Sequence, residues 1–171
     1  KLRVFLVDDH PVVRGGLKAL IDAQPDLRVI GEAADGLASI AAVIESKPDV
    51  VVMDLSMPLL GGAEATERIK AACPGVKVLG LTAHEDRGYV QVLLDAGASG
   101  FVLKRAAAED LVRAIRAVAL GGMYIDAAVM SEVLPARRRS ARTTDAAAVV
   151  PLSDREAGVL RLIAQGHAIK E

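Results

Sequence analysis

Five polar residues of the chain each stand where a short apolar run ends: Asp8, Asp9, Asp54, Thr82 and Lys104. Such runs are typical of buried β-strands, and in an open parallel sheet chemistry gathers outside the carboxyl ends of the strands. Carboxylates suit a hard divalent cation, and a hydroxyl and an ammonium suit the oxygens of a phosphoryl group. The spacing therefore predicts a site for a divalent cation and a phosphoryl group.

The role of each side chain follows from its chemistry. The adjacent carboxylates of Asp8 and Asp9, facing Asp54, repel one another unless a cation lies among them. Mg²⁺ is the expected ion, because it binds through a few carboxylates, waters and substrate phosphate. Asp54 is the candidate nucleophile, since a carboxylate can accept a phosphoryl group as an acyl phosphate. Lys104 then offers a positive charge to a phosphate oxygen, and Thr82 donates a hydroxyl hydrogen bond.

Simpler interpretations exist for each of these residues taken alone. An aspartate after a strand often caps the helix that follows, and Asp8-Asp9 before His10-Pro11 fits that role. A lysine such as Lys104 after a strand is commonly a solvated turn residue. The set as a whole favours the chemical interpretation, because four strand ends contribute complementary groups.

The elements that must position these residues alternate regularly along the chain. The expected strands are 2–8, 27–33, 49–54, 76–82 and 100–103, and the expected helices are about 11–24, 35–46, 61–72, 86–96 and 106–120. Continuously apolar strands such as DVVVMD and VKVLGL are typical of a sheet covered by helices on both faces. The alternation predicts an α/β fold, a doubly wound five-stranded parallel sheet.

The sequence changes character after this region. Gly121-Gly122 ends the last helix, and a shorter helix is expected around 126–134. Residues 136–151 carry a cluster of Arg and no apolar period, which is typical of a linker. Ser153 and Glu156 then form a capping box at the start of a further amphipathic helix.

The bulk composition limits the function classes. With 171 residues, 52% of them apolar, the chain can bury a full core and add a small second unit. The net charge of −1 divides into −4 for residues 1–134 and +3 for residues 135–171, so the basic tail is expected to meet a polyanion. Cys73 is the only cysteine, as expected in a reducing compartment such as the cytoplasm. No apolar run approaches the roughly 18 residues of a membrane span, so no membrane partner is expected.

Four segments carry a resemblance to a known family. They are DD at residues 8–9, MDLSMPLLGG at residues 53–62, LTA at residues 81–83 and FVLK at residues 101–104. In type and spacing they resemble the receiver domain of bacterial two-component response regulators, and the resemblance covers residues 2–120. It implies a flavodoxin-like sheet of order 2-1-3-4-5, in which the strands of Asp8/Asp9 and Asp54 are neighbours.

The resemblance also implies how the site works. Asp54 would be the phosphoacceptor, taking its phosphoryl group from the phosphohistidine of a sensor histidine kinase, and the acyl phosphate would later be hydrolysed. Asp8, Asp9 and Asp54 would hold Mg²⁺ together with the backbone carbonyl of Ser56.

The remaining implied roles concern the output of the domain. Thr82 and Lys104 would receive the phosphoryl group. Phe101 matches the aromatic switch position of the family, which turns inward when Thr82 moves. The change would reach the surface formed by helix 86–96, strand 100–103 and helix 106–120. Its output in this subfamily would be homodimerisation, which matches two-fold DNA half-sites.

A second resemblance lies in LSDREAGVLRLIAQG, residues 152–166. It is similar to the opening of the LuxR-type helix-turn-helix domain of NarL/FixJ regulators, and GGMYID at residues 121–126 is similar to the exit of the receiver in that subfamily. This implies sequence-specific DNA binding through the complete domain; an ordinary capped helix is the alternative. The chain stops at Glu171, before the recognition helix that enters the major groove, so these residues alone are not expected to bind DNA specifically.

The sequence thus predicts a phosphorylation-controlled transcription factor and not an enzyme. The expected parts are a receiver over 1–124, a short helix and linker over 125–151, and an incomplete LuxR-type helix-turn-helix domain over 152–171. One alternative is a stand-alone receiver that acts through protein–protein contacts, with a tail that serves only for oligomerisation. Another is a Mg²⁺-dependent phosphatase or phosphotransferase, which needs a substrate pocket or cap that the short βα units leave no room for.

Overall fold

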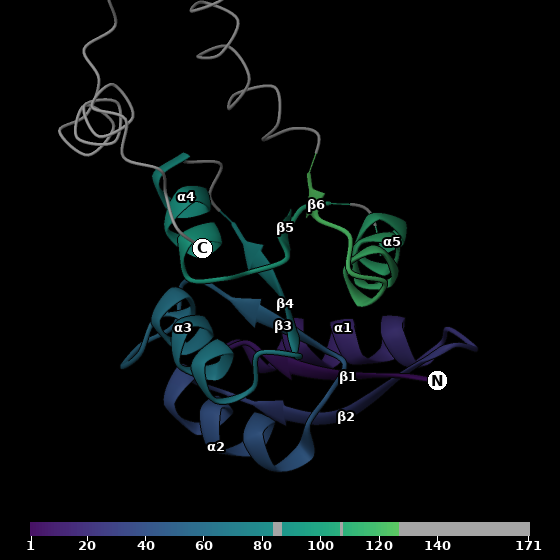
Figure 1. The fold of residues 1–171 in the computed structure, drawn as a ribbon. Helices are drawn as coiled ribbons and strands as arrows, with labels where there is room; N and C mark the ends of the chain where they lie inside the picture. The colour runs from purple at the N-terminus through teal and green to yellow at the C-terminus, as the bar shows by residue number, and fades with distance from the viewer. Residues whose placement is uncertain (84–86, 107, 127–171) are drawn as a thin grey trace, which may run out of the picture. The chain divides into compact units, whose positions relative to one another are not determined.

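Residues 1–83, 87–106 and 108–126 are described by a computed structural model, and they form a parallel sheet with helices on both faces (Figure 1). The strands are β1 Leu2–Val7, β2 Leu27–Ala33, β3 Val50–Asp54, β4 Lys77–Thr82, β5 Gly100–Leu103 and β6 Tyr124–Ile125. The helices are α1 Pro11–Asp22, α2 Gly36–Ser46, α3 Gly62–Ala72, α4 Arg87–Asp95 and α5 Ala108–Ala119. All of these elements belong to the first of two units, Lys1–Leu134; the second is Pro135–Glu171.

The strand order of the sheet is β2-β1-β3-β4-β5-β6, with every pairing parallel. The predicted α/β class and the order 2-1-3-4-5 are confirmed. The sheet differs from the prediction by one strand, because the two residues of β6 pair with Gly100 and Phe101 of β5. Gly100 makes room for this pairing, since a Cβ there would lie 2.0 Å from the carbonyl oxygen of Tyr124.

The two faces of the sheet have separate hydrophobic cores. Ile21 of α1 and Ile115 of α5 pack with Val4 and Val52 on one face. On the other face α2 and α3 cover residues such as Met53, and α4 packs against β5. Figure 1 shows α2 and α3 on one side of the sheet and α1 and α5 on the other. Burial on both faces explains why β3 and β4 are continuously apolar.

The five strands and five helices predicted over residues 2–120 are all present, with ends that differ by at most two residues from the expected bounds. Helix α1 begins with Pro11 at its first position, where the missing amide hydrogen leaves no partner unsatisfied. Helix α2 begins after Asp35, whose side chain accepts a hydrogen bond from the amide of Ala38 at 2.7 Å. Among the described residues, no helix is both long and apolar enough to cross a membrane. The helix expected around 126–134, the linker and the capped helix after 152 lie outside the described residues.

Candidate functional site

The order of the strands brings the predicted site residues to one edge of the sheet. Strand β3 lies between β1 and β4, and β5 lies beyond β4. Asp54 and Thr82 are the last residues of β3 and β4, and Lys104 directly follows β5. The amide of Lys104 donates a 2.7 Å hydrogen bond to the carbonyl oxygen of Thr82. This bond holds the backbone of Lys104 beside the end of β4.

Lys104 joins two buried carboxylates at this edge. Its Nζ lies 2.8 Å from Oδ2 of Asp8 and 2.7 Å from Oδ2 of Asp54. Both aspartates are only 1% exposed, so their charges have little access to water. Burial lowers the pKa of the Lys104 ammonium, but the hydrogen bonds and charges of Asp54 and Asp8 outweigh it, and the pKa is raised overall. The ammonium is therefore charged at neutral pH and compensates part of the negative charge of the site.

Backbone amides satisfy the other oxygens of these two carboxylates. Oδ1 of Asp8 accepts a hydrogen bond from the amide of His10 at 2.8 Å. Oδ1 of Asp54 accepts one from the amide of Ser56 at 3.1 Å. The two carboxylates are thereby held by the loops that follow their own strands, in addition to Lys104.

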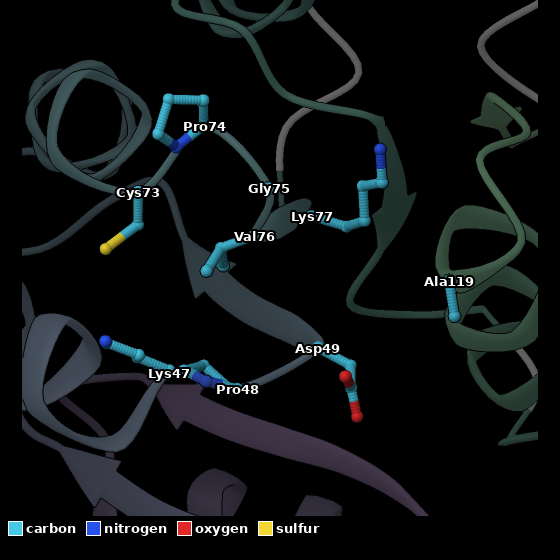
Figure 2. A pocket seen from close by; sticks show the side chains of 9 residues that line it. All are labelled: Lys47, Pro48, Asp49, Cys73, Pro74, Gly75, Val76, Lys77 and Ala119. Carbon is cyan, nitrogen blue, oxygen red and sulfur yellow. The ribbon is translucent and has the colours of Figure 1, made fainter.

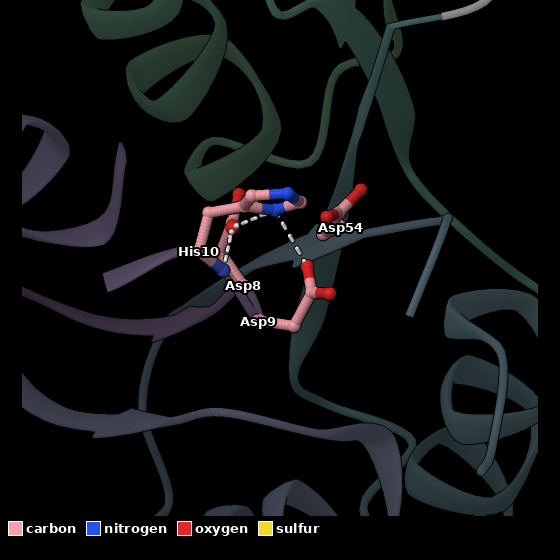
Figure 3. A group of neighbouring side chains, drawn as sticks. All are labelled: Asp8, Asp9, His10 and Asp54. Carbon is pink, nitrogen blue, oxygen red and sulfur yellow. Dashed lines mark hydrogen bonds and ion pairs between the residues drawn. The ribbon is translucent and has the colours of Figure 1, made fainter. Parts of the chain in front are cut away.

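Asp9 is placed differently from its neighbour. Nδ1 of His10 lies 2.7 Å from Oδ1 of Asp9 and 3.4 Å from Oδ1 of Asp8 (Figure 3). Oδ1 of Asp9 is buried and nevertheless has no hydrogen bond of acceptable geometry to any residue that the structure describes. The short contact with His10 is an ion pair only when the imidazole is protonated, so we regard this oxygen as unsatisfied. A buried anionic oxygen without a partner is unfavourable unless another group binds it.

The oxygen atoms of this group fit a divalent cation. Asp8, Asp9, His10 and Asp54 each offer one ligand atom, and these atoms lie within 4.8 Å of one another. Three of the four residues are carboxylates, which a hard cation such as Mg²⁺ prefers over nitrogen ligands. The unsatisfied oxygen of Asp9 is an independent sign that the group suits a cation.

The contact of His10 with the acidic group was not predicted from the sequence. It stands at the N-cap of α1 with a side chain 63% exposed. Its side chain makes no capping hydrogen bond and instead lies against the acidic group. The signal in the sequence was its direct adjacency to Asp8-Asp9. His84, two positions after Thr82, lies outside the described residues.

The other predicted site residues take varied positions. Thr82 is 1% exposed at the end of β4. Ser56 is exposed, and its amide is bonded to Asp54, while the role predicted for its carbonyl stays a prediction. Phe101 is fully buried, in the cluster that includes Leu93 of α4. Gly80 leaves room for the present position of Leu93, because a Cβ there would lie 2.1 Å from a methyl group of that leucine, which would have to shift.

The loop between Asp54 and α3 is tight for a steric reason. A Cβ at Gly62 would lie 2.1 Å from the carbonyl oxygen of Asp54 and 2.9 Å from the Cα of Leu55. The amide of Gly62 donates to the carbonyl oxygen of Leu55 at 3.2 Å. Only glycine permits this approach of two backbone segments, so Gly62 lets α3 begin directly against the peptide that carries Asp54.

A pocket of about 420 Å³ lies at the opposite ends of β3 and β4 (Figure 2). Its lining includes Asp49 and Lys77, which stand at the beginning of these strands, and Ala119 at the end of α5. It therefore lies at the other edge of the sheet from Asp54 and Thr82. Asp8, Asp9 and Asp54 are not among the residues that line it.

Comparison with known proteins identifies a family for this geometry. Residues 4–116 match the response regulator receiver domain. The transcriptional regulatory protein LiaR of Bacillus subtilis is 39% identical over 170 residues, which cover 99% of this chain and 80% of LiaR. The oxygen regulatory protein NreC of Staphylococcus aureus is also 39% identical, with the same shares of the two chains covered.

Solved structures lead to the same family. A two-component response regulator of the LuxR family from Aurantimonas is 37% identical with a TM-score of 0.78, and the match covers 81% of this chain and 99% of that one. A structure of two RcsB dimers bound to two parallel DNAs is 29% identical with a TM-score of 0.72, over 97% of this chain and 78% of that one. The chain therefore belongs to the response regulator family and is a two-component response regulator of the NarL/FixJ type, a class of transcriptional regulators controlled through a receiver domain.

Proposed function

We propose that Asp54 is the phosphoacceptor of this regulator and takes its phosphoryl group from the phosphohistidine of a sensor histidine kinase. The observation that carries this proposal is the contact of Lys104 with the buried carboxylates of Asp54 and Asp8 at 2.7 and 2.8 Å. A partly buried lysine held between two buried carboxylates stands where it can meet an oxygen of an incoming phosphoryl group. Phosphoryl transfer depends mainly on such positioning and charge compensation.

The chemical step uses few groups. A carboxylate oxygen of Asp54 attacks the phosphorus atom, an acyl phosphate bond forms, and the bond from phosphorus to the nitrogen of the donor histidine breaks. The electron pair of that bond stays on the imidazole nitrogen. Lys104 compensates the negative charge of the phosphoryl oxygens, and the hydroxyl of Thr82 donates a hydrogen bond to one of them. Water later attacks the phosphorus atom, the bond from phosphorus to the Asp54 oxygen breaks, and inorganic phosphate leaves, which restores the Asp54 carboxylate.

Mg²⁺ is the cation that we assign to the acidic group. Asp8, Asp9 and Asp54 would hold it, with the backbone carbonyl of Ser56 as a further ligand. When bound, the ion neutralises the carboxylates and the phosphoryl oxygens and orients them. Oδ1 of Asp9, which lacks a hydrogen bond from the described residues, supports this assignment most directly.

The output of the regulator extends to its partners. The relative RcsB is described as dimers bound to DNA, and we assign to this chain homodimerisation on phosphorylation and DNA binding through a complete C-terminal domain. The division into a receiver over 1–124, a linker over 125–151 and the start of a helix-turn-helix domain over 152–171 belongs to the same proposal. The match to LiaR over 99% of the chain favours it over a stand-alone receiver. A transcriptional regulator that meets a kinase and DNA works in the bacterial cytoplasm, which is the compartment we assign.

The proposed switch runs through the residues that pack behind the site. Thr82 pairs with Leu103 across β4 and β5, and Phe101 lies two residues before Leu103 in the same strand. A shift of Thr82 toward a phosphoryl oxygen is thus passed to β5 and to Phe101. Phe101 is fully buried in this structure, so its ring occupies the inward position of the proposed switch. A phosphoryl group then shifts the population toward the state that dimerises.

Treatment of the protein with beryllofluoride and Mg²⁺ is expected to strengthen homodimerisation by about tenfold, a typical coupling between two sites. Sedimentation velocity over a range of protein concentrations measures the effect. The Asp54→Asn variant is the control and should sediment alike with and without the mimic. A single unchanged species for the wild-type protein would contradict the proposed output.

A further inference from the structure

Arg14 of α1 reaches back over the loop that carries the two adjacent aspartates. Its Nη1 donates a 2.6 Å hydrogen bond to the backbone carbonyl oxygen of Asp8. Its Nε donates to Oε2 of Glu32 in β2 at 3.1 Å. The side chain is 19% exposed, so it is largely enclosed between the loop and the sheet. Arg14 is not a ligand candidate, because a guanidinium has no lone pair to offer a cation.

The carbonyl that Arg14 binds belongs to the peptide between Asp8 and Asp9. The amide of Asp8 donates to the carbonyl oxygen of Ala33 at 3.2 Å, so the peptide before Asp8 is tied to β2. The peptide after Asp8 is tied through Arg14. The direction of this second peptide sets where the Cα and the side chain of Asp9 stand.

Of the two aspartates, Asp9 depends more on Arg14 for the position of its carboxylate. The carboxylate of Asp8 has its own anchors in Lys104 and the amide of His10. Within the described part of the chain, Oδ1 of Asp9 has no hydrogen bond and only the contact with the exposed His10. The placement of the Asp9 carboxylate therefore rests mainly on its backbone. Arg14 ties the peptide before Asp9, and Oδ1 of Asp8 ties the peptide after it through the amide of His10.

Glu32 keeps Arg14 in this orientation. It accepts hydrogen bonds from Arg14 on one oxygen and from Nζ of Lys18 on the other, at 3.1 and 2.8 Å. The hydrogen bond from Lys18, aided by its charge and by Arg14, outweighs burial and lowers the pKa of the Glu32 carboxyl. Glu32 is thus ionised at neutral pH and remains a firm acceptor for the Arg14 guanidinium.

We propose that Arg14, anchored by Glu32, is a positioning residue that sets the Asp8–Asp9 peptide for divalent-cation binding and thereby for phosphorylation. The proposal rests on the proposed function of the acidic group and adds to it a residue that touches neither the cation nor the phosphoryl group. Outer contacts that orient ligands typically change metal affinity by ten- to a hundredfold, roughly, when they are removed.

Calorimetric titration with Mg²⁺ tests the proposal on the full chain. Arg14→Met is expected to weaken Mg²⁺ binding by roughly tenfold. Glu32→Gln, which leaves Arg14 in place but loosens it, should weaken binding to a smaller extent. Arg14→Lys keeps one donor and should lie between Arg14→Met and wild type. Arg28→Met, the same substitution at an exposed position of β2, is the control and should bind Mg²⁺ as wild type does.

A second readout separates positioning from general damage to the fold. The rate of phosphorylation by acetyl phosphate in Arg14→Met should approach the wild-type rate as the Mg²⁺ concentration is raised, because the defect lies in cation affinity. Unchanged Mg²⁺ affinity in both Arg14→Met and Glu32→Gln, or a rate defect that persists at saturating Mg²⁺, would overturn the positioning role. Wild-type protein that neither binds Mg²⁺ nor gains a phosphoryl group would instead refute the proposed function itself.

Discussion

Replacement of Lys104 by methionine is expected to slow phosphorylation of Asp54 by about a hundredfold or more, the usual effect of losing one pre-placed group that stabilises developing charge. Methionine has a similar length and fills the same space, but it offers neither a charge nor a hydrogen bond. The phosphoryl oxygens would then lose the ammonium that now contacts Asp54 at 2.7 Å. A bound cation would still neutralise part of the negative charge at the site, so the residual rate should still depend on Mg²⁺.

The same substitution is expected to destabilise the cation-free protein by about 3 kcal/mol, because it leaves the two buried carboxylates of Asp8 and Asp54 without their shared partner. The folded-state pKa of Lys104 is raised, so its contribution is fully present below the ordinary pKa of lysine and is lost only as the pH rises through the raised value. The stability difference between the two proteins should therefore be complete at neutral pH. Added Mg²⁺ should reduce it, since the ion neutralises the same carboxylates.

Urea unfolding with and without Mg²⁺, together with the rate of acetyl phosphate labelling, measures both effects. Lys77→Met is the matched control, because Lys77 stands at the other end of β4, beside the pocket of Figure 2. If Lys104→Met is labelled as fast as wild type, Lys104 does not act on the phosphoryl group. If the stability of Lys104→Met without Mg²⁺ equals that of wild type, the contact of Lys104 with the two carboxylates does not contribute to the stability of the fold.

Asp9→Asn is expected to act in opposite directions on stability and on function. The variant should bind Mg²⁺ at least about tenfold more weakly, since an anionic ligand becomes a neutral one. The cation-free protein should gain stability, because one of three neighbouring carboxylates loses its charge. Residues selected for a ligand commonly lower the stability of the ligand-free fold in this way.

Mg²⁺ titration and thermal unfolding of the cation-free protein test both halves of this prediction. Asp110→Asn, at an aspartate in the first turn of α5, is the control and should leave Mg²⁺ affinity as it is in wild type. Wild-type Mg²⁺ affinity in Asp9→Asn would remove Asp9 from the ligand set. A loss of stability without Mg²⁺ would mean that the Asp9 carboxylate makes favourable contacts of its own.

The positions of the site residues could be predicted from the sequence because local patterns determine them. Apolar runs end at Asp8, Asp54 and Thr82, and the continuously apolar strands of a sheet covered on both faces make these ends recognisable in the sequence. Parallel pairing then brings those ends to one edge. The expected bounds erred where local signals are weakest, as in α1, which ends at Asp22 instead of residue 24.

The contacts within the site could not be predicted, because they join residues far apart in the chain. Lys104 meets Asp8 across 96 positions, and nothing near either residue encodes the pairing. The bond of Arg14 to the carbonyl oxygen of Asp8 depends on the path of the β1–α1 loop, since the acceptor is a backbone atom that every residue possesses. Strand β6 was missed because its two residues are too few to show a period.

The mass of the intact protein after incubation with acetyl phosphate and Mg²⁺ tests the central claim most directly. Wild-type protein, with its fold checked by circular dichroism, is predicted to gain the mass of one phosphoryl group, and peptide mapping should place that group on Asp54. Asp54→Asn should gain none, and wild type without Mg²⁺ should gain much less. A folded wild-type protein that gains no mass, or that carries the phosphoryl group on another residue, would contradict the account.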